Sequence, residues 1–188
     1  MTVARHILLA FLLLAALPLP AQESPDPVLR ELLRQAANDA DSFPDRFDAQ
    51  VWLTDMSRRL RPQVVDHAER IAILKRAHFE ARRADLPPEL VLAVIDVESN
   101  FDRFAISVAG AQGLMQVMPF WLNEIGRPRD NLMHIGTNLR LGCTILKYYL
   151  DLEDGDLVRA LGRYNGSLGK RDYPNRVLDK LRLKWFRV

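Results

Sequence analysis

Cysteine is almost absent from this sequence. Cys143 is the only cysteine among 188 residues, so a disulfide within the chain is excluded. It lies in an apolar helical pattern and has no convincing His partner nearby in the sequence. This pattern favours a buried, unreactive thiol over a catalytic nucleophile.

Histidine is also scarce, and neither sign of charge dominates. Three histidines, His67, His78 and His134, lie beyond the N-terminal region, and they do not form the ligand set of a metalloprotease. We therefore expect no metal site and no cofactor. The 26 basic and 24 acidic residues give a formal net charge of +2, which is no general indication of nucleic-acid binding.

The charge is nevertheless uneven along the chain. From residue 159 to the end there are nine basic and two acidic residues. A solvated helix face is the favoured interpretation, and attraction to an anionic polymer is the alternative. A nucleic-acid binder would depend on this segment alone, so we expect no nucleic-acid partner.

Long apolar runs are missing except at the N-terminus. Residues 7–19 are apolar and lie between a charged start and Ala21. This order is typical of a secretory signal peptide, and the run is shorter than the roughly 20 residues of a membrane span. We predict a signal peptide over residues 1–21 and a periplasmic or secreted protein without stable membrane insertion. An uncleaved anchor is the alternative.

The rest of the chain predicts two helical regions. Residues 22–84 show helical apolar spacing without recognisable chemistry, which indicates an α-helical N-terminal extension. Residues 85–188 are again largely helical. Between Asn100 and Gln116, small residues and a short apolar alternation predict a loop with a small β-hairpin. The predicted fold is mainly α, with a minor β element.

Glu98 is the first candidate for chemistry. Val91, Val94 and Ile95 precede it by seven, four and three residues, so the carboxyl group ends an apolar stripe on one helix face. Burial raises a carboxyl pKa, and the negative end of the helix dipole acts in the same direction. Such a group can serve as a general acid near neutral pH. A helix-end Glu that reaches into water is the alternative.

No second carboxylate is clearly placed beside Glu98. Asp96 lies roughly 200° around the helix and faces away, and the direction of Asp102 in its loop is undetermined. A glycosidase of the usual kind needs two carboxylates. If this chain cleaves glycosidic bonds, the pattern favours assistance by the substrate's own N-acetyl group.

Two more segments carry polar groups at turns. Residues 110–116 contain two glycines that permit close backbone approach, and Gln116 can both donate and accept hydrogen bonds. Tyr164 and Asn165 end a helix opened by Asp156, with the ring of Tyr164 on its apolar face. An ordinary hairpin and an ordinary Asn-Gly helix end are the alternatives.

Together these segments resemble the soluble lytic transglycosylase family, whose catalytic domain is similar to goose-type lysozyme. The resemblance runs from Leu86 to about Leu178. Its motifs are the Glu-Ser pair within residues 92–99, the Gly-Leu-Met-Gln segment within 107–119, the helix start at 138–142, and Tyr-Asn at 164–165. The four occur in the family's order and spacing. One departure is Tyr-Asn-Gly-Ser here, where the family usually has Tyr-Asn-Ala-Gly.

The resemblance implies a peptidoglycan enzyme that cuts between N-acetylmuramic acid (MurNAc) and N-acetylglucosamine (GlcNAc) and leaves 1,6-anhydromuramyl ends. It implies that Glu98 is the acid and then the base, with glycan strands as the partner. It also implies a substrate-binding set: Ser99, Gly113, Met115, Gln116, Tyr164 and Asn165. Residues 85–188 would be the catalytic domain, and residues 22–84 could dock a cell-envelope protein. The alternatives are a lysozyme-like hydrolase and a glycan-binding or scaffold protein without turnover.

Overall fold

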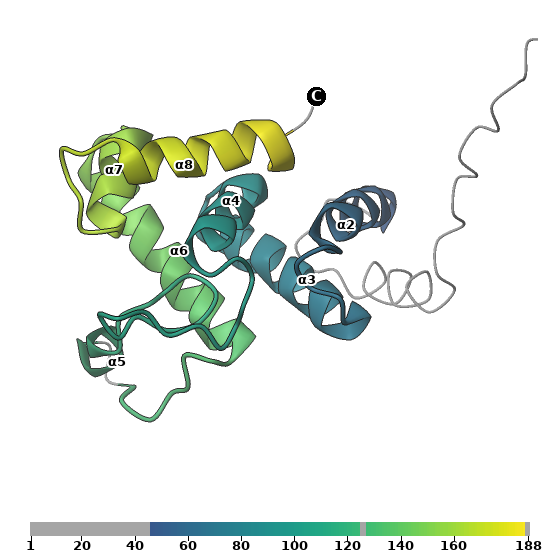
Figure 1. Cartoon of the computed structure of the whole chain (residues 1–188), viewed down its shortest axis with the longest axis horizontal. Coiled ribbons are helices and arrows are strands. Elements are labelled where there is room, and N and C mark those ends of the chain that lie inside the picture. Colours follow the sequence, from purple (N-terminus) through teal and green to yellow (C-terminus); the bar gives the residue numbers. More distant parts are fainter. Residues whose placement is uncertain (1–45, 125–126, 187–188) are drawn as a thin grey trace, which may run out of the picture.

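The computed structural model describes residues 46–124 and 127–186. The described part is mainly helical, as predicted (Figure 1). Its elements are α2 (Arg46–Leu60), α3 (His67–Arg83), α4 (Pro88–Glu98), α5 (Phe120–Glu124), α6 (Ile135–Leu152), α7 (Leu157–Tyr164), α8 (Asp172–Lys180) and the π-helical turn η1 (Leu181–Trp185). The predicted leader (residues 1–21) and residues 22–45 of the predicted extension lie outside the described residues. None of the described helices is long and apolar enough to cross a membrane.

Local signals explain where several helices begin. The side chain of Asp66 accepts a hydrogen bond from the backbone N–H of Glu69 at 2.7 Å and caps α3. Asp156 caps α7 in the same way, through the N–H of Arg159 at 3.0 Å. These caps satisfy N–H groups that have no partner inside the helix. α4 begins at Pro88, whose fixed φ suits the first helical position.

α4 lies at the centre of the packing. It contacts α3, α8 and η1, while α6 packs against α3 and α7. Figure 1 shows α4 beneath α8, with α6 and α3 on either side. Residues 91–95 are fully buried, which explains why this helix is apolar on nearly every face. Its C-terminal end, which carries Glu98, is therefore held by packing on several sides.

The predicted β-hairpin between α4 and α5 is not a regular hairpin. Among the described residues there are two isolated antiparallel bridges, Ile106 with Gln112 and Gln112 with Val117, and no strand. Gly110 and Gly113 have φ values of +87° and +75°. Each reverses the chain after a few residues, so a ladder cannot extend beyond one pair.

A side chain from α6 takes the place of the missing ladder. The Oδ1 atom of Asn138 accepts from the N–H of Met115 at 2.8 Å, and its Nδ2 atom donates to the carbonyls of Gln112 and Leu132 at 2.8 and 2.9 Å. Asn138 is only 1% exposed. One buried amide thus satisfies three backbone groups and fixes the loop against α6.

Candidate active site

Glu98 occupies the last position of α4, where the helix meets the loop. Its side chain is partly buried. Burial raises its pKa from 4.5 to about 7, against the opposing effects of a hydrogen bond from Tyr173 and the positive charge of Arg176. The raised pKa that the sequence predicts is therefore confirmed. A carboxyl group that titrates near pH 7 can both give and take a proton at neutral pH.

Tyr173 is the hydrogen-bond partner of Glu98. Its hydroxyl donates to Oε1 of Glu98 at 2.6 Å, and the residue is only 3% exposed. Burial, reinforced by the charge of Glu98, raises the pKa of the Tyr173 phenol well above its usual value. The phenol therefore remains a donor at any physiological pH. No sequence pattern points to Tyr173, because it lies 75 residues from Glu98 and the contact depends on how α8 docks on α4.

Tyr164 supports the neighbouring loop rather than Glu98 directly. Its hydroxyl donates to the backbone carbonyl of Met115 at 2.7 Å. Burial, and next the charge of Glu98, raise its pKa well above the usual value, which agrees with a position near the carboxyl group. Asn165 follows it at the C-cap of α7 and is exposed.

Ser99 connects the end of α4 to the same loop. Its hydroxyl donates to the carbonyl of Leu114 at 2.8 Å. The backbone N–H of Ser99 also donates to the carbonyl of Ile95, which closes the last helical turn. The contact to Leu114 fixes the distance between the loop and the helix end that carries Glu98.

Gln116 and Gly113 shape this loop from within. Gln116 has a φ of +48°, and its Nε2 atom donates to the carbonyls of Ala105 and Gly113 at 3.1 and 2.9 Å. A Cβ atom on Gly113 would lie 2.4 Å from Nδ2 of Asn138 and 2.5 Å from the carbonyl oxygen of Leu132. Only glycine fits at this position without displacing both neighbours.

The resemblance places Met115 among the substrate-binding residues, and the structure places its side chain in the core. Met115 is fully buried, and its sulfur lies 3.9 Å from the thiol of Cys143. The side chain packs against Gly142, where an added Cβ atom would lie 2.5 Å from the sulfur. Met115 therefore joins the loop to the core through its side chain and to Tyr164 through its carbonyl.

Asp96 and Asp102, the two other carboxylates considered from the sequence, form their contacts away from Glu98. The side chain of Asp96 is fully buried and pairs with Lys180 and Lys184 at 2.8 and 2.7 Å. These contacts hold the pKa of Asp96 below its usual value, although burial acts in the opposite direction. Asp102 is exposed and accepts from the N–H of Phe104. Within residues 46–124 and 127–186, no carboxylate is hydrogen-bonded to Glu98.

Other reactive or ligating groups are not concentrated near Glu98. The Cys143 thiol is buried, which raises its pKa far above the usual value and makes it a poor nucleophile. The described part of the chain contains no group of three or more His, Cys, Asp or Glu residues that could hold a metal ion.

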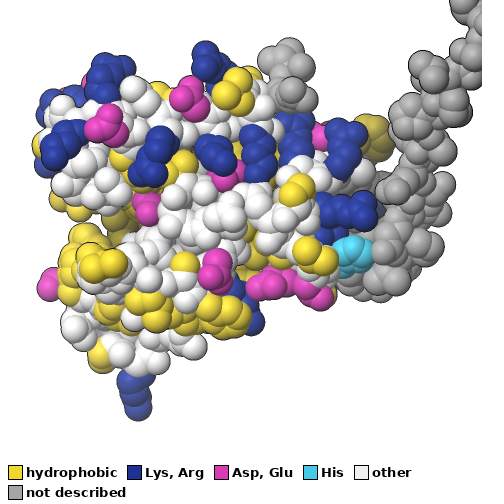
Figure 2. Space-filling view, in the orientation of Figure 1, with side chains coloured by type: hydrophobic (Ala, Val, Ile, Leu, Met, Phe, Trp, Pro, Cys, Tyr) yellow, Lys and Arg dark blue, Asp and Glu magenta, His cyan; other side chains and the backbone are white. Residues whose placement is uncertain are grey.

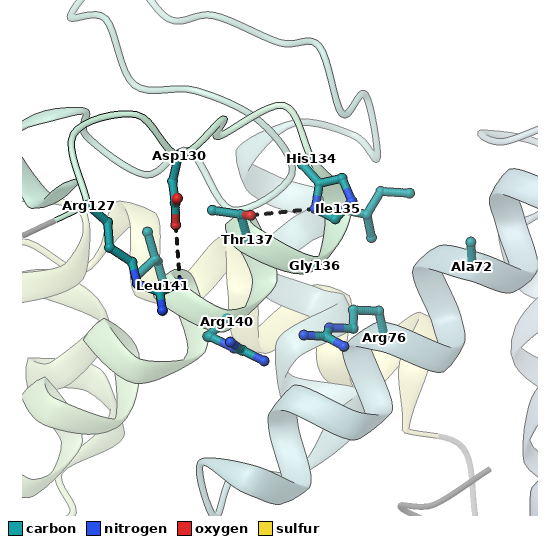
Figure 3. Close-up of a pocket in the computed structure, with 10 residues that line it drawn as sticks. All are labelled: Ala72, Arg76, Arg127, Asp130, His134, Ile135, Gly136, Thr137, Arg140 and Leu141. Atoms are coloured by element: carbon teal, nitrogen blue, oxygen red, sulfur yellow. Dashed lines mark hydrogen bonds and ion pairs between the residues drawn. The ribbon is translucent and has the colours of Figure 1, made fainter. Parts of the chain in front are cut away.

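A hollow of about 590 Å³ lies between α3 and the start of α6 (Figure 3). Three of the ten residues that line it are arginines, namely Arg76, Arg127 and Arg140. Asp130 pairs with Arg127 at 3.4 Å. None of the predicted site residues lines this hollow. It is not a candidate for acid–base chemistry.

A second hollow is visible at the left edge of the face in Figure 2. Lys and Arg side chains lie over α8 above it, and hydrophobic side chains gather inside it and on its lower side, toward α5 (Figures 1 and 2). Since Tyr173 of α8 contacts Glu98, the basic side of this hollow belongs to the helix that completes the acid–base site.

Comparisons with known proteins show which family this chain resembles in sequence. A family profile described as "Transglycosylase SLT domain" matches residues 76–181, more than half of the chain. That stretch contains every predicted site residue, Glu98 among them, and also Tyr173. Among solved structures, an inactive mutant of lytic transglycosylase Slt from Pseudomonas aeruginosa aligns with a TM-score of 0.46 and 23% identity, over 86% of this chain and 32% of that one.

Two relatives share shorter stretches of sequence. A transglycosylase of Enterobacteria phage PRD1 is 31% identical over 106 residues, which are 53% of this chain and 39% of the phage protein. The membrane-bound lytic murein transglycosylase C of Actinobacillus pleuropneumoniae is 49% identical over 39 residues, or 21% of this chain and 11% of that protein. This chain thus matches well under half the length of either relative. On the extent of the profile match, the chain belongs to the Transglycosylase SLT domain family.

Proposed function

We propose that this chain is a peptidoglycan lytic transglycosylase. It cleaves the β-1,4 bond between MurNAc and GlcNAc without water and leaves 1,6-anhydromuramyl ends. The observation that carries the proposal is the Glu98 carboxyl group, which has a pKa of about 7 and lies at a packed helix end in a chain of this family. A single group that titrates near neutrality suits a reaction in which the same residue is first acid and then base.

The proposed reaction has two proton transfers. Protonated Glu98 gives its proton to the glycosidic oxygen as the bond to the muramyl anomeric carbon breaks, and the GlcNAc end leaves as an alcohol. The muramyl N-acetyl group stabilises the anomeric centre in place of a second carboxylate. The Glu98 carboxylate then takes the proton of the muramyl 6-hydroxyl, whose oxygen bonds to the anomeric carbon. Glu98 ends protonated, ready for another cycle.

The neighbouring side chains support this sequence of steps. The hydroxyl of Tyr173 stabilises the ionised Glu98 that exists between the two transfers. Ser99 and Tyr164 each bind a backbone carbonyl of the loop, at Leu114 and Met115. In the proposal they maintain the wall on which the glycan rests, while Gln116 and Asn165 contact the sugars.

The proposal includes the setting in which the enzyme works. Residues 1–21 export the protein to the periplasm or beyond. Residues 85–188 form a catalytic domain similar to goose-type lysozyme, preceded by the extension of residues 22–84, which offers a surface for a cell-envelope partner. The packing of α2 and α3 in the same core as α4 supports a close association between the extension and the catalytic helices.

Digestion of purified peptidoglycan tests the proposal. The soluble products of the wild type and of Glu98→Gln are identified by mass spectrometry. Anhydromuramyl ends from the wild type, and none from Glu98→Gln, are expected. Reducing muramyl ends, heavier by one water, would contradict the proposal in favour of a hydrolase. Retention on the polymer without any product would favour a binding or scaffold role.

A further inference from the structure

The basic C-terminal stretch is not a uniformly solvated face. Five of its nine basic residues form ion pairs: Arg159 and Arg163 with Glu153, Lys180 and Lys184 with Asp96, and Arg182 with Asp179. A sixth, Arg187, lies outside the described residues. The remaining three, Lys170, Arg171 and Arg176, are exposed and form no ion pair within the described part of the chain. Within the described part of this stretch, the basic side chains that form no ion pair thus all lie between residues 170 and 176.

That place is the start of α8, beside the candidate acid. Lys170 and Arg171 directly precede the helix, and Arg176 follows Tyr173 by three residues, on the same face. The guanidinium carbon of Arg176 lies 5.8 Å from the centre of the Tyr173 ring. The hydroxyl of that ring lies 2.6 Å from Glu98. Arg176 is also close enough to Glu98 for its charge to lower the pKa of that carboxyl.

The local balance of charge leaves Arg176 free to bind an anion. Asp172 is the only acidic residue between Lys170 and Arg176, and it is exposed without an ion-pair partner among the described residues. Glu98 is the other nearby carboxyl group, and burial raises its pKa to about 7. Basic side chains along α8 also border the hollow seen in Figure 2.

We propose that Arg176, flanked by Lys170 and Arg171, binds a carboxylate that the substrate carries next to the bond Glu98 attacks. The inference rests on the proposed function, since the muramyl sugar is the part of a peptidoglycan strand that bears such a group. The carboxylate belongs either to the lactyl substituent itself or to the peptide built on it. Arginine suits this role because its planar guanidinium can bind both carboxylate oxygens at once.

The contact between Arg176 and this carboxylate favours a peptidoglycan strand over a neutral glycan, in addition to raising the affinity for the peptidoglycan strand. A neutral GlcNAc oligomer offers the same ring hydroxyls and acetamido groups but no anion, so Arg176 adds nothing to its binding. For an exposed pair of this kind we expect about a two- to tenfold gain in affinity for the anionic glycan. Salt should weaken the gain, because exposed charges are screened over roughly 10 Å at 0.1 M ionic strength.

The test measures binding without turnover, in the full-length Glu98→Gln protein. Dissociation constants are compared for Glu98→Gln alone, with added Arg176→Gln, and with added Arg182→Gln. Arg182 is the matched control, because it is exposed on the same C-terminal stretch but is paired with Asp179. The ligands are a GlcNAc oligomer, a peptide-free MurNAc-GlcNAc oligomer with free lactyl carboxylates, its lactyl methylamide, and the same oligomer with stem peptides.

Arg176→Gln should weaken binding of a carboxylate-bearing oligomer, leave the GlcNAc oligomer unchanged, and lose its effect at high salt. Weaker binding of the free lactyl form but not of its methylamide assigns the lactyl carboxylate as the ligand. Weaker binding of the stem-peptide form alone assigns a peptide carboxylate.

Three results would overturn the inference while leaving the proposed function intact: an equal loss of affinity for the neutral oligomer, no loss of affinity for any ligand, or an equal loss with Arg182→Gln. Failure of every glycan to bind would overturn both.

Discussion

Replacing Tyr173 with phenylalanine removes one oxygen atom from the environment of Glu98 and leaves the ring in place. The lost hydroxyl donates to Oε1 of Glu98 at 2.6 Å, a bond that is strongest when the carboxyl group is ionised. Its loss disfavours the ionised form. The desolvation that raises the pKa of Glu98 to about 7 remains, since the phenyl ring still fills the same space. The pKa of Glu98 should therefore rise further.

The size of the shift follows from the strength of such a bond. A hydrogen bond to a charged group contributes about 1.5–3 kcal/mol, and one pKa unit corresponds to about 1.4 kcal/mol. The pKa of Glu98 in Tyr173→Phe is therefore expected about one to two units above that of the wild type. Because protonated Glu98 starts the proposed reaction, the alkaline limb of kcat/KM should move upward by the same amount.

The shift can be measured in two ways. The pH dependence of kcat/KM between pH 5 and 10 gives the alkaline limb, and a ¹³C NMR titration of the Glu98 carboxyl gives its pKa directly. Tyr164→Phe is the control, because its hydroxyl binds the carbonyl of Met115 instead of Glu98, and it should leave the pKa nearly unchanged. An unchanged or lowered pKa in Tyr173→Phe would refute the argument that this hydroxyl stabilises the ionised carboxylate.

Two further predictions concern stability. The pKa of Glu98 is raised in the folded state, from 4.5 to about 7, so its contribution to stability is complete below about pH 4.5 and is lost as the pH rises through 7. Glu98→Gln should therefore gain up to about 3 kcal/mol over the wild type between pH 4 and 8, as measured by urea unfolding, and a constant difference would contradict the burial argument. Gly113→Ala should cost about 3 kcal/mol or more, because its Cβ atom would lie 2.4 Å from Asn138. Gly110→Ala, with a similar positive φ but nothing within 4 Å of the added atom, should cost only about 1–2 kcal/mol. Equal losses of stability in the two variants would mean that the positive φ alone, and not the contact with Asn138, sets the cost of adding a Cβ atom.

Local sequence patterns were sufficient to predict a mainly helical fold and to single out Glu98 as a buried acid at a helix end. The apolar stripe that precedes Glu98 lies within one helix, so its spacing alone places the carboxyl group at the end of a buried face. The same applies to Asp156, which caps α7 through a residue three positions away. Such signals depend only on near neighbours and on helix geometry.

Contacts between distant segments could not be predicted in this way. Tyr173 meets Glu98 only because α8 packs across α4, and no pattern within α8 specifies that register. Asn138 was part of a recognised motif, yet its hydrogen bonds to the loop depend on the approach of α6. Those bonds also explain why the predicted hairpin is replaced by isolated bridges. The orientation of Met115 was undetermined for the same reason, since an alternating pattern does not say which face of a short loop is inward.

The docking of α8 and η1, the segment of residues 172–185, on α4 has a consequence for how the protein loses activity on heating. Asp96 and Glu98 are two residues apart, and each contacts that segment, through Lys180 and Lys184 and through Tyr173. If that segment detached from α4, water would reach Glu98, and the pKa of Glu98 would return toward 4.5. The carboxyl group would then be ionised at neutral pH and unable to donate a proton, so activity should disappear while the helical core is still intact.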